Sequence, residues 1–313
     1  MVVESIIQPA AGKVVEVTLG GQGRRTVTVG GESALPFLSF EGQMPHRPII
    51  AVDVEDSPPT NWAEPLLRVW GPAVKDLATW AKAAVEAGAD AIALTLTSTH
   101  PDRENASPQA AVSSVKRVLD AVDVPLIVYG PGVAEKDNEV LVAVADANSG
   151  AGLALGVCED KNYRTIVAAC MANGHVAIAK TPIDLNLAKQ LNILIADMGL
   201  PPERILMDPT TGALGYGIEY TYSVMERLRL AALQGDRWCA MPLICTVGYE
   251  AWRQKESRVA EGVPAEWGDL QRRGILWEAT TASTLLQAGA DVLVMRHPQA
   301  IALVRGAIDR LVG

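Results

Sequence analysis

Apolar and polar positions follow one repeated pattern from residue 48 onward: a short β-branched run, a polar or glycine-bearing turn, and a stretch with helical periodicity. Near-continuous apolar strands are typical of a parallel sheet whose outer face is covered by helices. The eight predicted strands occupy residues 48–53, 90–97, 125–129, 152–158, 175–180, 204–208, 239–246 and 290–296. Predicted helices between them include residues 74–87, 107–121, 184–198, 219–233, 273–288 and 298–311.

Eight strand-helix units are the number that closes a (β/α)8 TIM barrel. An open doubly wound sheet would instead need a glycine-rich phosphate loop after its first strand, where this chain has the acidic, proline-containing segment 53–59 (DVEDSPP). Ahead of the barrel, two β-rich runs at 14–19 and 26–29 flank a glycine turn, which predicts a β-hairpin that caps the bottom of the barrel. We therefore predict one domain over residues 1–313, with a hairpin extension at 1–47 and the barrel at 48–313.

Composition limits the partners and the compartment. A net charge of -9 and the lack of a basic stripe disfavour nucleic acid and anionic membrane surfaces. No apolar run reaches the ~20 residues of a bilayer span, and the first residues, with Glu4 among them, lack a signal-peptide pattern. The four cysteines form no Cys-x-x-Cys pair and look like buried thiols in a reduced compartment. We expect a cytoplasmic protein that holds no iron-sulfur cluster by itself.

Ligand-facing residues of a barrel lie at the carboxyl ends of its strands. Here those ends are polar and varied, with Asp53, Tyr129, Asp208 and Thr246 among them. Any one of the aspartates is as easily explained as an acceptor for loop amides, but together the residues favour a site. The histidines are predicted to be structural, loop or helix-start residues, and the sequence indicates no metal site.

The most specific stretch is residues 207–220 (MDPTTGALGYGIEY) after the sixth predicted strand. A plain turn between a strand and a helix takes only ~2–6 residues, so this longer loop needs another explanation. Its glycines allow the backbone to approach a flat ligand closely, next to a helix amino terminus. A second long loop is predicted at residues 249–271.

These residues also carry a family resemblance. The Asp-Pro and Gly-x-Gly pattern after strand six, with an aspartate ending strand one, resembles pterin-binding barrels such as dihydropteroate synthases and methyltetrahydrofolate-dependent methyltransferases. A closer resemblance links residues 208–227 (DPTTGALGYGIEYTYSVMER), 274–282 (GILWEATTA) and 295–298 (MRHP) to the small subunit of the corrinoid iron-sulfur protein, an acetyl-CoA decarbonylase/synthase delta-type subunit. Length and the leading hairpin agree, so the resemblance covers nearly the whole chain.

The resemblance implies a non-catalytic subunit of a heterodimeric methyl carrier in the anaerobic acetyl-CoA (Wood-Ljungdahl) pathway of carbon dioxide fixation. In that family a large subunit carries the 4Fe-4S cluster, and the cobamide (a cobalt corrinoid) lies between the large subunit and this barrel. The methyl group comes from methyltetrahydrofolate through a separate methyltransferase and passes to acetyl-CoA synthase. The residues expected to face the cobamide are Asp184, Asn186, Asp208, Thr210, Thr211, Gly212, Ala213, Leu214, Gly215, Tyr216, Thr246 and Tyr249.

Two other functions stay open. A pterin-dependent methyltransferase has the same fold, and Asp53, Asn186 and Asp208 are suited to grip a pterin edge by paired hydrogen bonds. A sugar-phosphate barrel enzyme is less favoured, because strands seven and eight lead into no glycine-rich phosphate loop. None of the four histidines lies in the Asp-x-His-x-x-Gly pattern of a cobalt-ligating module, so this chain is not expected to hold a corrinoid alone.

Overall fold

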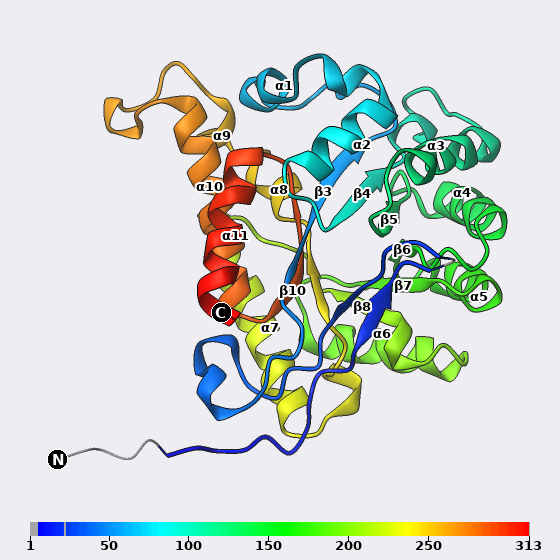
Figure 1. Ribbon diagram of the computed structural model, residues 1–313, viewed down its shortest axis with the longest axis vertical. Coiled ribbons are helices and arrows are strands. Elements are labelled where there is room, and N and C mark those ends of the chain that lie inside the picture. The colour runs from blue at the N-terminus through cyan, green and yellow to red at the C-terminus, as the bar shows by residue number, and fades with distance from the viewer. Residues whose placement is uncertain (1–5, 22, 313) are drawn as a thin grey trace.

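Eight parallel strands close a barrel in the computed structural model, which describes residues 6–21 and 23–312 (Figure 1). The strands follow one another around the barrel in chain order, and the last pairs with the first, with Val292 beside Ile49. The (β/α)8 prediction is confirmed. The strands are β3 (Ile49–Glu55), β4 (Ala91–Thr95), β5 (Leu126–Tyr129), β6 (Ala154–Cys158), β7 (Val176–Lys180), β8 (Ile205–Asp208), β9 (Leu243–Cys245) and β10 (Ala290–Met295).

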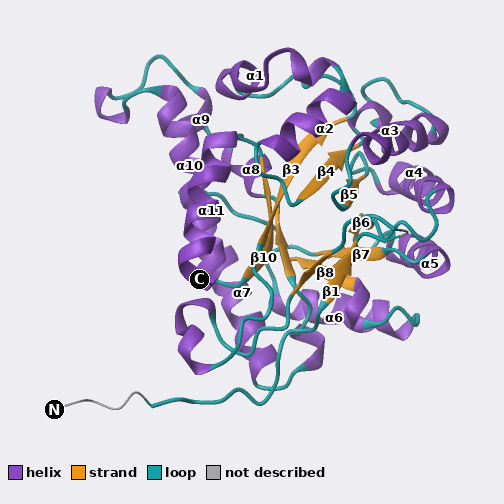
Figure 2. Cartoon of the chain, in the orientation of Figure 1, coloured by secondary structure: helices purple, strands orange, loops and turns teal. Residues whose placement is uncertain are grey.

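Helices form the outer ring around this sheet, as the colouring by secondary structure shows (Figure 2). Aspartate or serine caps several helix starts, and Gly88 and Gly289 end two helices with positive φ, as their Gly-Ala-Asp turns predict. The helices are α1 (Glu64–Trp70), α2 (Leu77–Glu86), α3 (Pro108–Ala121), α4 (Ala134–Ala147), α5 (Tyr163–Asn173), α6 (Leu185–Asp197), α7 (Ile218–Leu233), α8 (Val247–Ala251), α9 (Lys255–Arg258), α10 (Leu270–Gln287) and α11 (Pro298–Val312).

The amino-terminal hairpin closes the bottom of the barrel. Its strands β1 (Val17–Leu19) and β2 (Val27–Val29) pair antiparallel. The buried side chains of Val17, Leu19 and Val29 join the apolar cluster inside the barrel, which includes Ile49 and Ala91 at the starts of their strands. The predicted cap is therefore confirmed for the described residues, which exclude Gln22 of the turn and residues 1–5 with Glu4.

Several predicted boundaries are wrong, and three of them have a clear physical reason. The first barrel strand continues through Val54 to Glu55, two residues past the predicted end, because both stay buried. The strand predicted at 239–246 covers only Leu243–Cys245, since Asp236 caps a 3-10 turn at Arg237–Cys239 that precedes it. The helix predicted at 74–87 starts at Leu77, because the Asp76 side chain caps it and a separate 3-10 turn occupies Gly71–Lys75.

The long loop predicted at 249–271 does leave the barrel, but short helical elements interrupt it. It contains the end of α8, all of α9 and the 3-10 turn Ala265–Trp267, and α10 begins at Leu270. The buried guanidinium of Arg273 organises the segment by donating hydrogen bonds to the backbone carbonyls of Glu256, Val259, Trp267 and Gly268. One buried arginine therefore replaces the regular backbone pairing that this excursion lacks. In Figure 1 it stands out from the barrel at the upper left.

Candidate functional site

The carboxyl ends of the strands form a polar mouth, and an ion-pair network occupies its β3–β10 side. Arg296, directly after β10, binds the Asp53 carboxylate with both Nε and Nη2 at 2.7 Å. Asp53 also accepts a hydrogen bond of 3.2 Å from Thr95. The Arg296 guanidinium lies over the Trp62 ring, whose indole donates to Glu55 at 2.6 Å. Both oxygens of Asp53 are thus already bound within the protein.

Asp208 ends β8, two strands from β10, and its carboxylate is buried with only one of its two oxygens hydrogen-bonded. Its Oδ1 accepts the Thr210 backbone N–H at 2.9 Å, while Oδ2 has no hydrogen-bond partner among the described residues. Burial raises the pKa of Asp208 to about 6, although Lys180 lowers it in part. The Tyr129 and Thr181 hydroxyls are likewise buried without a partner in the described chain. Such unpaired buried atoms cost stability, so their clustering at one mouth is typical of a functional site.

The glycine-rich loop between β8 and α7 is held in an unusual backbone shape. Thr210 has φ +64°, a left-handed value that is rare for a β-branched residue, and its hydroxyl donates to the Thr181 carbonyl at 2.6 Å. The Thr211 hydroxyl accepts the Thr246 N–H at 2.9 Å. A Cβ at Gly212 would lie 2.5 Å from the Gly217 carbonyl oxygen, so only glycine fits there. These contacts within the loop account for part of its length, so its length alone does not require a ligand.

The predicted cobamide-facing residues do not share one surface. Thr210 lines a cavity of about 600 Å³ over β6, β7 and β8, together with Lys180 and Thr181. Thr211, Gly212 and Ala213 are buried, and Gly215 is exposed. Asp184 uses its carboxylate to cap α6 by accepting the Asn186 and Leu187 backbone N–H groups, which leaves the Asn186 side chain on the exposed first turn.

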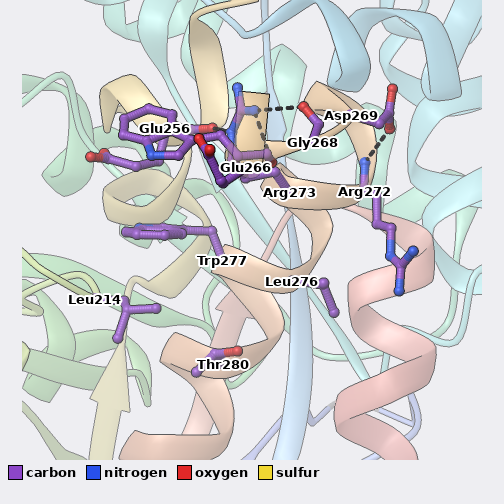
Figure 3. Close-up of a pocket in the computed structure, with 11 residues that line it drawn as sticks. Leu214, Glu256, Glu266, Gly268, Asp269, Arg272, Arg273, Leu276, Trp277 and Thr280 are labelled. Carbon is purple, nitrogen blue, oxygen red and sulfur yellow. Dashed lines mark hydrogen bonds between the residues drawn. The ribbon is translucent and has the colours of Figure 1, made fainter. Parts of the chain in front are cut away.

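Two other predicted residues, Leu214 and Tyr216, face residues 256–269 in the segment after β9 and not the mouth. Leu214 lines a cavity of about 680 Å³ between α10 and residues 256–269, where Trp277 and Leu276 form apolar walls (Figure 3). Tyr216 donates from its hydroxyl to Glu256 on α9 at 3.3 Å. The loop therefore connects the mouth to the segment after β9.

Tyr249 and four arginines were brought together only by the fold. Tyr249, nearly half exposed at 47%, lines a third cavity of about 660 Å³ over β3 and β4, with Arg103, Arg253, Arg258 and Arg296. Apart from Arg296, which ends a strand, these arginines lie in segments with no pattern that marks them as site residues. Their convergence gave no signal in the sequence beyond the length of the segment after β9.

Two of the four histidines and all four cysteines are buried in the fold, whereas His100 lines the same cavity as Tyr249. His175 is buried at the bottom of the barrel with its ring bonded to Ala145 and Leu153, and His297 caps the start of α11 and stacks on Trp252. All four cysteines are buried and free. No group of three or more possible metal-ligating His, Cys, Asp or Glu side chains occurs within residues 6–21 and 23–312. Over the same residues, no helix has both the length and the apolar character that crossing a membrane requires.

Residues 16–305 match the family described as CO dehydrogenase/acetyl-CoA synthase delta subunit. The chain belongs to this delta-subunit family. The acetyl-CoA decarbonylase/synthase complex subunit delta of Methanopyrus kandleri is 39% identical over 93% of this chain and 72% of its own length. That of Methanothermobacter thermautotrophicus is 37% identical over 96% of this chain and 76% of its own length. The resemblance drawn from residues 208–227, 274–282 and 295–298 is therefore confirmed.

Solved structures similar to this delta-family chain include dihydropteroate synthases. The enzyme of Yersinia pestis with a sulfonamide drug complex has a TM-score of 0.59 at 15% identity and covers 94% of this chain and 97% of its own. The Coxiella burnetii enzyme in complex with pteroic acid has a TM-score of 0.57 at 12% identity over 95% of this chain and 97% of its own. At these identities the likeness shows the barrel fold alone, in agreement with the strand order.

Proposed function

We propose that this delta-family chain is the barrel subunit of a methyl-carrying complex and covers a cobamide that a larger subunit holds. The complex is proposed to accept a methyl group from methyltetrahydrofolate through a methyltransferase and to deliver it to acetyl-CoA synthase. Membership of the delta-subunit family carries this proposal. The large subunit is proposed to supply the 4Fe-4S cluster and the site that retains the corrinoid.

The mouth suits a cover for a wide amide-bearing ring. Its residues offer hydroxyls, backbone groups and an exposed aromatic ring, and none of the four histidines lies in the Asp-x-His-x-x-Gly pattern of a cobalt-ligating module. The methyl-transfer chemistry is that of the bound cobamide's cobalt, which needs protection from water and acids. Thr210 and Thr181 at the β8 side and Tyr249 at the β3 side are the residues of this chain proposed to contact the corrin edge.

Thr210→Glu tests the proposal in the complex assembled with its larger subunit. A carboxylate at the mouth should exclude an apolar ring, so we expect cobalt content and the corrinoid absorption bands to fall by at least half relative to the wild type. Thr26→Glu makes the same change at an exposed position beside the bottom hairpin and should leave both unchanged. Full cobalt content in Thr210→Glu would contradict the proposed contact, and failure to assemble any corrinoid complex from wild-type chains would contradict the function.

A pterin-dependent methyltransferase is the second candidate, favoured by the unpaired Asp208 Oδ2 and Tyr129 hydroxyl in the mouth. Of the three residues suggested for a pterin grip, Asp53 is already bound to Arg296, and Asn186 is exposed. Titration of the isolated chain with methyltetrahydrofolate separates the two functions. Saturable binding and methyl transfer to free cobalamin would favour the enzyme, whereas no reaction until the larger subunit is added supports the carrier.

A further inference from the structure

A cavity of about 660 Å³ lies between the loops after β3 and β4 and the segment after β9, and it includes Tyr249 of the proposed corrin contacts. This volume falls within the range of small-molecule sites. Four arginines from three separate parts of the chain line it: Arg103 after β4, Arg253 and Arg258 around α9, and Arg296 after β10. In a chain with a net charge of -9, such a gathering of guanidinium groups is unusual.

Acidic groups pair with three of the four arginines. Asp53 and Glu250 pair with Arg296 and Arg253 but do not line the cavity. Of the lining carboxylates, Glu55 is bound by Trp62 and lies 3.8 Å from Arg103, and Asp102 is exposed. Arg258 is therefore the one guanidinium group of this wall with no carboxylate partner among the described residues.

Arg258 differs from the other three arginines because nothing in the described chain binds its guanidinium group. Its side chain is exposed on α9 and has no hydrogen-bond or ion-pair partner among the described residues. Guanidinium groups bind phosphate oxygens in a planar, bidentate manner, which makes arginine the preferred side chain for such anions. A free arginine facing a cavity that holds three others favours an oxyanion ligand.

Aromatic walls indicate what the anion is attached to. The guanidinium groups of Arg253 and Arg296 lie 4.8 and 5.5 Å from the centroid of the Tyr249 ring, and Trp252, only 1% exposed, borders the same cavity. Stacked arginine and tyrosine form a flat surface suited to a planar ring. The cavity is also much larger than an inorganic phosphate ion needs.

We propose that this cavity binds a phosphate ester that carries an aromatic heterocycle, the chemistry of a nucleoside phosphate. The phosphate would lie against Arg258 and Arg103, and the heterocycle would stack beside Tyr249. This inference goes beyond the proposed covering of a cobamide, because the isolated chain is expected to bind the phosphate ester without a corrinoid. Cobalt retention and phosphate-ester binding are separate measurements, so either can fail alone.

Calorimetric titration of the full chain at low ionic strength tests the inference with three probes: adenosine 5′-monophosphate, adenosine and inorganic phosphate. We expect saturable binding of the monophosphate, with adenosine and phosphate each at least about tenfold weaker. Added salt should weaken the binding of adenosine 5′-monophosphate, because charges at an open cavity are screened. No saturable binding of the monophosphate at millimolar concentration would overturn the inference, and equal affinity for phosphate alone would overturn the role of the ring.

Arg258→Ala locates the site. Removal of this unpartnered side chain should weaken monophosphate binding about tenfold without affecting the fold. Arg227→Ala on α7 is the matched control, because Arg227 is also exposed and unpaired within the described chain but lies outside the cavity. Equal affinities of the Arg258→Ala and Arg227→Ala variants would show that the anion binds elsewhere and would overturn the assignment.

Discussion

The two ends of the barrel differ in what fills them. At the bottom, the side chains of Val17 and Leu19 fill the interior, and the adjoining backbone is bonded, as between Val15 and Ala240 at 2.8 Å. At the mouth, buried polar atoms of Asp208 and Tyr129 lack partners in the described structure. Unpaired buried atoms also occur towards the bottom, on Glu32 and Arg229, but there an apolar cluster closes the barrel. The mouth lies at the carboxyl ends of the strands, where ligands bind in this fold.

One buried carboxylate at the mouth, that of Glu278, nevertheless accepts hydrogen bonds with both of its oxygens. Glu278 on α10 is buried and accepts hydrogen bonds from the Trp252 indole at 2.7 Å and from the backbone N–H groups of Arg296 and His297 at 2.5 and 3.1 Å. Burial raises the pKa of Glu278 to about 7 against the lowering effect of these donors. Glu278 joins the segment after β9 to the end of β10. A buried hydrogen-bond network therefore stabilises the same end of the barrel that holds the candidate site.

Replacement of that carboxylate should give the largest effect. Glu278→Ala leaves three buried donors unpaired, and we expect the free energy of unfolding to fall by about 4 kcal/mol in a denaturant titration. Glu278→Gln keeps one acceptor oxygen and should lose about half as much. A loss below about 1 kcal/mol for Glu278→Ala would show that the mouth does not depend on this support.

A substitution in the hairpin cap should give the second-largest loss in the free energy of unfolding. Leu19→Ala removes a fully buried side chain from the barrel interior and should lower the free energy of unfolding by about 3 kcal/mol, as other buried leucines do. Leu276→Ala, at a position 46% exposed, should cost less than about 0.5 kcal/mol in the same urea titration. If the two variants unfold at the same urea concentration, the cap contributes nothing to stability.

Asp208→Asn should stabilise the protein. The pKa of Asp208 is raised from 3.8 to about 6, so the folded state holds its proton more tightly than the unfolded state. Stability is therefore lost as pH rises from about 4 through about 6, and above pH 6 the full penalty, at most about 3 kcal/mol, remains. The variant should gain about 1–2 kcal/mol at pH 7.5 and almost nothing at pH 4 by thermal denaturation. An equal gain at both pH values would contradict the ionisation argument.

Position 210 should show the smallest effect. Thr210→Gly relieves the left-handed backbone but loses the bond to Thr181 and gains unfolded-state entropy, so we expect a change within about 1 kcal/mol. Thr210→Ala loses the same bond and keeps the strain, so it should be less stable than Thr210→Gly by about 1 kcal/mol. The reverse order in chemical denaturation would show that the backbone at Thr210 is not strained.

Hydrophobic periodicity determined the barrel, its strand count and its hairpin cap, because each strand and helix buries a face whose spacing is local in the chain. The same local patterns placed Asp208 and Thr210 after strand six. They failed at residues 249–271, where order comes from Arg273 and from distant carbonyls that leave no periodic signal.

Only the tertiary structure decided which polar residues share a surface. Leu214 and Tyr216 are neighbours of Thr210 in the chain but face residues 256–269 in the segment after β9. Arg103 and Arg258 are more than a hundred residues apart and yet line one cavity. Side-chain direction depends on loop backbone angles and on long-range ion pairs, neither of which periodicity specifies. The family and fold were thus fixed by sequence, and the grouping of site residues by folding in three dimensions.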